Sequence, residues 1–571
     1  MYVHLTERPH HLSYRVINSL IVGAAVILGA IIVAAVLIGP LSSDDDTDTE
    51  LAGSQSTPTA DDSADDAVTG NADTTPTPED APTEEPESEP TPEPEPQQTV
   101  AGVVTDSGSE EPLAGVTVVA ERDGESAASA TTGEDGRFEL ADVPSDATLS
   151  FSLEGYRTFE QPVDDDSELT VALQSSALAG QVLDQEGQPI WDATVASGDA
   201  LTWTEEDGTF QLGDAPDEGE VIFKAPGFAA QRVPIGELGN EVTMEPKSVK
   251  GIYATAGATA DDERFNELMD MIDRTELNSI VLDVKDSAGL VFYNTDVEMA
   301  HEIGAVAPTY DVEQRLAQLD ERGIYAIARV VIFEDPILAE ARQDLAIMDS
   351  EEGGLWRTFG GLPWVNPYRE EVWEYNIALM EEAVQLGFDE IQLDYMRFPS
   401  DGPLNRADYG QESTAETRDQ AIADFLRASY EVIAPTSAYL TGDIFGMTLW
   451  DPTEGGIGQD LVTVTEHLDY VLPMIYPSHF YEGSMGFDVP NDHPYEVIYQ
   501  SLNNGATMLP ERLRPKIRPW LQDFTYGPGV AYGDHEVREQ IRATEDFGAS
   551  GWILWNAASS YHEGALGPAD S

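Results

Sequence analysis

Hydrophobic and polar positions alternate over residues 389–395, where the chain reads DEIQLDY. In a strand with a side-chain period of two, Ile391 and Leu393 share one face. Glu390, Gln392 and Asp394 then share the other face. A strand that lies wholly in a core has no packing reason for such a polar face. The pattern therefore predicts a strand whose polar side leads to a solvated rim, with Asp394 at its carboxyl end.

Residues 247–571 repeat this strand pattern eight times, with amphipathic helices in between. The predicted strands are Gly251–Ala256, Ser279–Val284, Ala326–Phe333, Asp389–Tyr395, Tyr439–Phe445, Tyr470–Tyr476, Arg518–Phe524 and Trp552–Asn556. The predicted helices include Arg264–Thr275, Arg418–Ile433 and His535–Phe547. Eight strands alternating with helices indicate a (β/α)8 TIM barrel. A doubly wound open sheet is the alternative, but no Gly-x-Gly-x-x-Gly follows the first strand and polar residues close nearly every strand.

Residues 98–246 contain an internal repeat of short alternating strands. VAGVVTD from Val100 matches LAGQVLD from Leu178, and EDGRFEL from Glu134 matches EDGTFQL from Glu206. Strands separated by Asp-Gly turns predict two small β-sandwiches, at 98–174 and 175–246. The pattern resembles the carboxypeptidase regulatory-like domain, a prealbumin-like sandwich. That resemblance implies spacer or binding modules without catalytic residues.

The amino-terminal part contains one long apolar run. Residues 1–15 carry Arg8 and Arg15, and residues 16–39 are almost wholly apolar. This predicts a single transmembrane anchor with a cytoplasmic amino terminus and all later domains outside the cell membrane. A cleaved signal peptide is the alternative. Residues 40–97 are rich in Asp, Glu, Thr and Pro, which predicts a disordered, extended acidic linker.

Composition narrows the class of protein further. The 571 residues include 107 acidic and 28 basic ones, for a net charge of -79, which excludes a protein that binds nucleic acid through its phosphates. The chain has no cysteine, so disulfides and thiolate metal sites are excluded. No His, Asp or Glu cluster has the spacing of a metal site, and we expect neither metal nor cofactor.

The candidate functional residues are those at the carboxyl ends of the predicted strands, where barrel active sites lie. Carboxylates perform acid and base work on glycosidic bonds, and aromatic faces stack on sugar rings, so the set predicts a polysaccharide site. In strand order the candidates are Asp283, Lys285, Arg329, Glu334, Asp394, Arg397, Asp443, Tyr476, His479, Trp520, Gln522, Asp523, Trp555 and Asn556.

Each candidate has an expected role. Asp394 is the predicted nucleophile or base, and the predicted acid is Asp443, with Asp523 as second choice. All others are predicted to bind substrate. Among them Asp283 and Lys285 orient the sugar, Tyr476 and Arg397 position Asp394, and Trp520 and Trp555 form platforms. Two structural alternatives stay open: Asp283 and Lys285 neutralise each other, or Arg397 is only a structural partner of Asp394.

Residues from Gly251 to about Tyr561 also resemble a known family. GFDEIQLDYMRFP, VLPMIYPSHF, RPWLQDF and GWILWNA are similar to the putative glycoside hydrolase domain, a TIM-barrel family of unknown function found in bacterial surface proteins. The resemblance implies a barrel and glycoside hydrolysis. FDEIQLDYMRFP is also similar to the chitinase signature, but the chitinase acid falls at Met396 and its middle aspartate at Gln392. This favours Asp394 with a carboxylate from a neighbouring strand, as in barrels of the α-amylase type.

The sequence thus predicts a membrane-anchored extracytoplasmic glycoside hydrolase that acts on a polysaccharide by paired carboxylates. Two alternatives remain. One is a catalytically inactive carbohydrate-binding protein, and the other is a structural surface protein with a barrel scaffold. The glycan, its linkage and the oligomeric state do not follow from the sequence.

Overall fold

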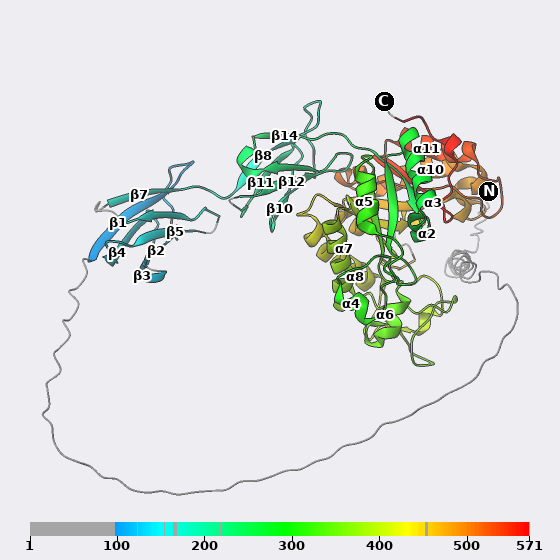
Figure 1. Ribbon diagram of the computed structural model, residues 1–571, viewed down its shortest axis with the longest axis horizontal. Helices are drawn as coiled ribbons and strands as arrows, with labels where there is room; N and C mark the ends of the chain where they lie inside the picture. Colours follow the sequence, from blue (N-terminus) through cyan, green and yellow to red (C-terminus); the bar gives the residue numbers. More distant parts are fainter. Residues whose placement is uncertain are drawn as a thin grey trace, which may run out of the picture.

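The computed structural model describes residues 97–569 except 123, 154, 164–167, 217 and 452–454. The predicted anchor and nearly all of the predicted acidic linker lie outside these residues. Within the described part of the chain, no helix combines the length and apolar character that crossing a bilayer requires. Figure 1 shows two β-sandwiches followed by a barrel, with the second sandwich between the first one and the barrel.

The first sandwich has a three-stranded sheet in the order β4-β1-β7 and a four-stranded sheet in the order β3-β2-β5-β6. Its buried core includes Val104, Phe138 and Phe151 between the two sheets. The strands are β1 (Gln97–Asp106), β2 (Thr117–Arg122), β3 (Glu125–Thr131), β4 (Arg137–Pro144), β5 (Thr148–Ser152), β6 (Phe159–Pro162) and β7 (Glu168–Leu173).

The second sandwich repeats this arrangement, with sheets in the orders β11-β8-β14 and β10-β9-β12-β13. In both sandwiches the first strand pairs antiparallel with the fourth and parallel with the seventh. The internal repeat seen in the sequence is therefore a repeat of topology. The strands are β8 (Leu178–Leu183), β9 (Thr194–Ser197), β10 (Ala200–Trp203), β11 (Thr209–Leu212), β12 (Glu220–Lys224), β13 (Gln231–Pro234) and β14 (Glu241–Thr243).

The matching Asp-Gly turns explain why both repeats keep glycine. Gly136 and Gly208 have φ angles of 71° and 76°, which L side chains rarely adopt. A Cβ atom at Gly136 would lie 2.5 Å from the carbonyl oxygen of Val104, and one at Gly208 would lie 2.6 Å from that of Val182. Only glycine lets the turn pass this close to the first strand.

The carboxyl-terminal domain is a closed barrel of eight parallel strands, as predicted, so the open-sheet alternative is wrong. The strand order follows the chain. The strands are β15 (Val249–Ala254), β16 (Ser279–Lys285), β17 (Tyr325–Val331), β19 (Glu390–Asp394), β21 (Tyr439–Phe445), β22 (Tyr470–Ile475), β23 (Trp520–Gln522) and β24 (Gly551–Trp555).

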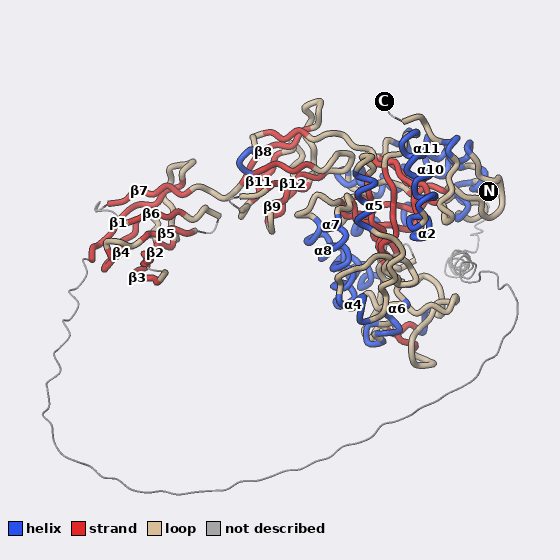
Figure 2. The backbone as a smooth tube through the Cα atoms, viewed as in Figure 1, coloured by secondary structure: helices blue, strands red, loops and turns tan. Residues whose placement is uncertain are grey.

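Helices surround the barrel strands (Figure 2). The three predicted helices correspond to α3, α8 and α11, and a two-stranded ribbon of β18 (Met348–Asp349) and β20 (Ala407–Asp408) extends the loops. The helices are α2 (Ala256–Ala260), α3 (Asp262–Arg274), α4 (Glu298–Glu302), α5 (Val312–Asp320), α6 (Pro336–Ala341), α7 (Glu370–Leu386), α8 (Ala415–Ile433), α9 (Leu461–Glu466), α10 (Pro494–Met508) and α11 (Asp534–Phe547).

The polar face of β19 points into the barrel, which confirms the alternation that the sequence indicated. Glu390 is buried and accepts hydrogen bonds from Arg518 and from Thr441 Oγ1. Gln392 lies above it, and both of its amide atoms lack a partner among the described residues. Asp394 completes the row at the carboxyl end of the strand. The interior polar groups therefore lead towards that end of the barrel.

The second sandwich packs against the opposite, amino-terminal end of the barrel strands. Lys224 is buried, donates to the carbonyl oxygen of Ala438 at 2.7 Å and lies 3.5 Å from the Asp469 carboxylate. The backbone N–H of Gly227 donates to the hydroxyl of Tyr470, the first residue of β22, at 2.7 Å. The sandwich thus closes the end of the barrel that is remote from Asp394.

Candidate active site

Asp394 is held by Arg329, which projects from the neighbouring strand β17. The Nε and Nη2 atoms of Arg329 lie 3.0 and 2.6 Å from Asp394 Oδ2. The other oxygen, Oδ1, accepts a hydrogen bond from the backbone N–H of Tyr395 at 2.7 Å. Tyr395 has a φ angle of 51°, an uncommon conformation for a residue with a large side chain. Such local strain is typical of functional sites and fixes the end of β19.

Arg329 also holds a second carboxylate. Its Nη1 donates to Asp283 Oδ1 at 2.6 Å, and Asp283 Oδ2 accepts from the Tyr253 hydroxyl at 2.5 Å. The four residues come from β15, β16, β17 and β19, so one continuous network joins four adjacent strand ends. Charge-assisted hydrogen bonds of this kind fix orientation more strongly than neutral ones.

Asp443 stands beside Asp394 on the next strand. The register pairs Leu393 with Gly442, so the following residues, Asp394 and Asp443, are also neighbours. Asp443 is 2% exposed, and Trp520 Nε1 donates to its Oδ1 at 2.7 Å. Burial, followed by the negative charge of Asp394, raises the pKa of Asp443 well above its ordinary value. A carboxyl group with a raised pKa thus lies next to the carboxyl group that Arg329 holds.

Glu334 extends the site above β17. It is 4% exposed and, among the described residues, makes no hydrogen bond or ion pair. Burial raises its pKa to about 8, despite the nearby charge of Arg397. Arg397 donates to Phe398 O at 3.1 Å and Ser400 Oγ at 3.2 Å. The guanidinium therefore bonds to its own loop and not to Asp394.

Aromatic side chains line the site on the β22, β23 and β24 side. His479 stacks on Tyr526 with ring centroids 5.3 Å apart, and Tyr476 lies 5.5 Å from His479. Trp555 stacks on Tyr253 at 4.3 Å. Burial lowers the pKa of His479 to about 4, so its ring is neutral at neutral pH. Neutral aromatic faces of this kind suit sugar rings.

The structure contradicts both roles predicted for Lys285 on β16. Lys285 is buried on the outer side of the strand, where it pairs with Asp335 at 2.7 Å and donates to Asn376 at 3.0 Å. It therefore neither orients a sugar nor neutralises Asp283. Asp283 accepts hydrogen bonds from Arg329 and Tyr253, one at each oxygen, and its predicted role in orienting the sugar stays a prediction.

The three polar residues predicted at the carboxyl ends of β23 and β24 contact the neighbouring loops instead. The oxygens of Asp523 accept from the backbone N–H of His562 at 3.0 Å and contact its ring Nδ1 at 2.5 Å, so Asp523 is not available as the acid. Gln522 accepts from Ser478 N at 3.1 Å, and Asn556 donates to Asp523 O at 2.5 Å.

Two further predicted roles are wrong. Trp520 is 1% exposed and donates to Asp443, so it is a partner of the acid and not an open platform. Arg397 does not position Asp394, because Arg329 does so. The sequence predicted Arg329 at the rim, but only in a substrate-binding role.

Sequence reasoning missed Tyr253 and Asp401. Tyr253 lies two residues beyond Gly251 on the same face of β15, so side-chain alternation could have placed it in the barrel interior. Asp401 lies in the loop after β19, is buried, and its Oδ2 has no partner among the described residues. Nothing in the sequence marks that loop as returning to the site.

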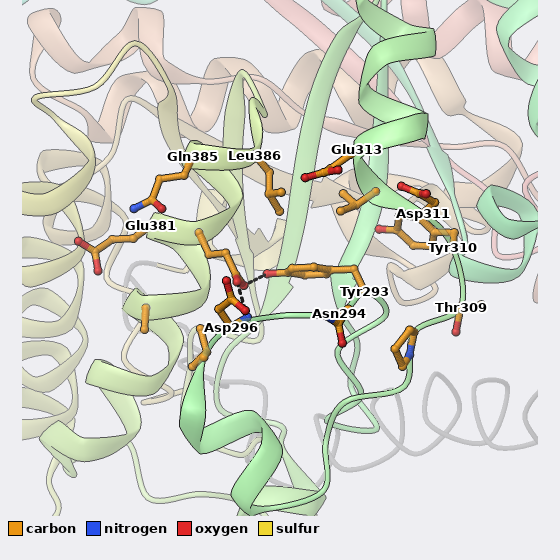
Figure 3. Close-up of a pocket in the computed structure, with 15 residues that line it drawn as sticks. Tyr293, Asn294, Asp296, Thr309, Tyr310, Asp311, Glu313, Glu381, Gln385 and Leu386 are labelled. Atoms are coloured by element: carbon orange, nitrogen blue, oxygen red, sulfur yellow. Dashed lines mark hydrogen bonds between the residues drawn. The ribbon is translucent and has the colours of Figure 1, made fainter.

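No set of three or more His, Asp or Glu side chains in the described residues is arranged to hold a metal ion. A cavity of about 840 Å³ lies on the outer wall, between α7 and the segment that leads into α5 (Figure 3). Tyr293, Asp296 and Glu381 line it, and Tyr293 donates to Glu382 at 2.5 Å. This cavity is separate from the carboxyl groups at the strand ends.

Comparison with solved structures gives several similar proteins. A hypothetical protein from Ruminiclostridium thermocellum is 35% identical, with 34% of this chain and 96% of that chain covered and a TM-score of 0.30. The PgaB (BpsB) glycoside hydrolase domain from Bordetella bronchiseptica is 12% identical, with coverage of 55% and 95% and a TM-score of 0.43. A chitinase from Chromobacterium violaceum is 12% identical, with coverage of 56% and 96% and a TM-score of 0.34.

Comparison with curated proteins gives no match. The carboxypeptidase regulatory-like domain model matches residues 99–174, which are the first sandwich. The model described as "Putative glycosyl hydrolase domain" matches residues 251–561, more than half of the chain and nearly the whole barrel. The chain therefore belongs to this glycosyl hydrolase domain family, and its barrel is the domain that defines the family.

Proposed function

We propose that the barrel hydrolyses a glycosidic bond of a polysaccharide, with Asp394 as nucleophile and Asp443 as proton donor. The observation that carries the proposal is the pair itself. Two inward-facing carboxyl groups occupy neighbouring positions of adjacent strands, one beside a guanidinium and one buried beside an indole N–H. When its surroundings keep one carboxyl group protonated and leave its neighbour ionised, the first can act as the acid and the second as the nucleophile.

The reaction has two balanced steps. In the first, an Asp394 oxygen bonds to the anomeric carbon while the glycosidic C–O bond breaks, and Asp443 gives its proton to the leaving oxygen. In the second, the Asp443 carboxylate takes a proton from water, and the resulting hydroxide equivalent displaces Asp394. Both carboxyl groups are then in their starting states.

The strand spacing favours retention of configuration. Adjacent strands lie about 4.8 Å apart, so the backbone positions of Asp394 and Asp443 are separated by about this distance. Carboxyl groups separated by a similar distance would match the roughly 5–5.5 Å of retaining enzymes and would leave no room for the intervening water that inversion needs. Trp555, Tyr476 and His479 supply ring faces for the sugar on the opposite side of the site.

The protein also acts outside the cell in this proposal. The apolar run of residues 16–39 anchors the chain, the acidic residues 40–97 form a stalk, and the two sandwiches carry the barrel away from the membrane. The repeated topology supports a spacer role for both sandwiches.

The test is the release of reducing ends by the full chain from a panel of neutral, acidic and amino-sugar polysaccharides. Asp394→Asn should abolish release, whereas Asp320→Asn, which removes an exposed carboxylate outside the site, should not. Release that survives Asp394→Asn contradicts the assignment. Glycan binding without release by the wild type would favour the inactive carbohydrate-binding alternative.

A further inference from the structure

Two buried carboxyl groups at the site form no ion-pair contact within the described residues. Glu334 and Asp401 are 4% and 3% exposed, and neither forms an ion pair within the described residues. Asp401 Oδ2 has no hydrogen-bond partner there, and Glu334 makes no hydrogen bond. Buried carboxyl groups are expected to be paired, because an unpaired one loses its hydration without compensation. The Glu334–Asp401 pair is thus incomplete in the protein alone.

Arg397 is the nearest cation but does not complete the pair. Its guanidinium lies against the rings of Trp364, Tyr395 and Phe445, with centroid distances of 5.2, 5.0 and 4.6 Å. Its Nη1 donates to Phe398 O and to Ser400 Oγ. This aromatic enclosure holds Arg397 beside the two carboxyl groups without an ion-pair contact to either.

The Glu334–Asp401 pair is continuous with the catalytic carboxylates. Val331 pairs with Asp394 in the barrel register, and Glu334 follows it after only two intervening residues. The charges of both Asp394 and Asp401 act on Glu334. Arg329 is already shared between Asp283 and Asp394, and it forms no ion pair with Glu334 or Asp401 within the described residues. A bound sugar that reaches Asp394 would therefore meet an excess of carboxyl groups.

We propose that the Glu334–Asp401 pair binds the ammonium group of a 2-amino-2-deoxy sugar, so that the substrate is a cationic, amino-bearing polysaccharide. An ammonium group offers three hydrogen-bond donors and the positive charge that the pair lacks. Ring hydroxyls can accept from the free donors of Arg397. An N-acetylated sugar carries no charge, and a uronic acid carries a negative charge that the carboxyl groups would repel. This inference rests on the proposed function, because it names the substrate class of that site.

The test is calorimetric binding of glucosamine and N-acetylglucosamine tetrasaccharides to the full chain carrying Asp443→Asn. That background blocks turnover and replaces a neutral carboxyl with a neutral amide, so the charge of the site is kept. We expect the glucosamine tetrasaccharide to bind at least tenfold more tightly. Adding Glu334→Gln and Asp401→Asn should erase the difference. The matched control adds Glu205→Gln and Glu206→Gln, which removes two exposed charges from the second sandwich and should preserve it.

Equal affinity for the two tetrasaccharides, or no binding of the glucosamine one, overturns the proposal. A preference that survives Glu334→Gln with Asp401→Asn also overturns it, because the acidic surface would then be its source. If the double variant fails to fold, the two single variants decide, and each should reduce the preference at least threefold. Hydrolysis is scored separately on the wild type. Preferential binding without cleavage supports the amino-sugar subsite and refutes the hydrolase. Cleavage of both glycans at equal rates supports the hydrolase and refutes the subsite.

Discussion

Arg329 meets Asp394 through two nitrogen atoms that converge on a single carboxylate oxygen, at 3.0 Å for Nε and 2.6 Å for Nη2. Its remaining terminal nitrogen binds Asp283 at 2.6 Å. One planar guanidinium therefore fixes two carboxylates from strands on either side of its own. The ammonium group of a lysine side chain could not fix the orientation of both carboxylates at once.

Arg329→Lys should lower kcat/KM at least about 100-fold, because an ammonium group cannot hold Asp283 and Asp394 in the same geometry. The measurement is steady-state hydrolysis of the best glycan of the panel. Arg322→Lys is the control, since Arg322 also bridges two aspartates, Asp270 and Asp273, but on the surface. Equal losses in both variants would show that the effect is not specific to the site.

Asp443→Asn should abolish most activity, by roughly 10²–10⁴-fold, because the proton donor is lost. For the wild type, the raised pKa of Asp443 means that the donor is protonated below that pKa and is lost as pH rises through it. Activity should therefore fall on the alkaline side. A pH profile of kcat/KM measures this, and a profile that rises steadily into alkaline pH would contradict the role of Asp443.

The same substitution should stabilise the fold at neutral and alkaline pH. The folded state keeps a proton on Asp443 that the unfolded state releases above its ordinary pKa of 3.8. Stability of the wild type thus falls between these two pKa values, by about 1.4 kcal/mol per pH unit, and Asp443→Asn avoids that loss. Tm should match the wild type near pH 4 and exceed it increasingly at higher pH. A constant Tm difference across pH would argue against this linkage.

Lys224→Ala should destabilise the contact between the second sandwich and the barrel by about 3 kcal/mol, because it leaves Asp469 buried without its cation. Calorimetric unfolding measures this. Arg232→Ala is the control, since Arg232 also reaches the barrel, at Ser437 Oγ, but is exposed. Its cost should stay below about 1 kcal/mol. Similar small effects for both would mean that the contact contributes little.

Trp555→Ala should raise KM for the glycan about tenfold with a smaller change in kcat, since it removes the ring that we propose contacts the sugar and that stacks on Tyr253. Trp191→Ala removes an exposed indole of the second sandwich and serves as the matched control. A loss confined to kcat would place Trp555 in the support of the catalytic network instead of the binding face.

The barrel could be predicted from sequence because its strands are short, regular and periodic. The β21 prediction matches the structure at both ends, and the polar row of Glu390, Gln392 and Asp394 points inward as alternation requires. Period-two counting failed at Lys285, because the register shifts between Asp283 and Lys285 and the bulge turns Lys285 outward.

Side-chain partners could not be predicted in the same way. Asp523 is held by His562, 39 residues further along the chain, and Asp401 returns to the site through a loop without a regular pattern. Such pairs depend on loop paths and on lateral strand neighbours, which periodicity does not encode. For the same reason Asp394 and Asp443 could be predicted at the rim from the sequence, but the hydrogen bond from Trp520 to Asp443 could not.

The most direct test of the account is covalent trapping of the nucleophile. The full chain is incubated with a 5-fluoro glycosyl fluoride of the sugar that it cleaves and is then digested and examined by mass spectrometry. The account predicts one glycosyl adduct, on the peptide that contains Asp394, and its absence in Asp394→Asn. An adduct on another residue, or none while the wild type hydrolyses its glycan, would contradict the assignment of Asp394 as the nucleophile.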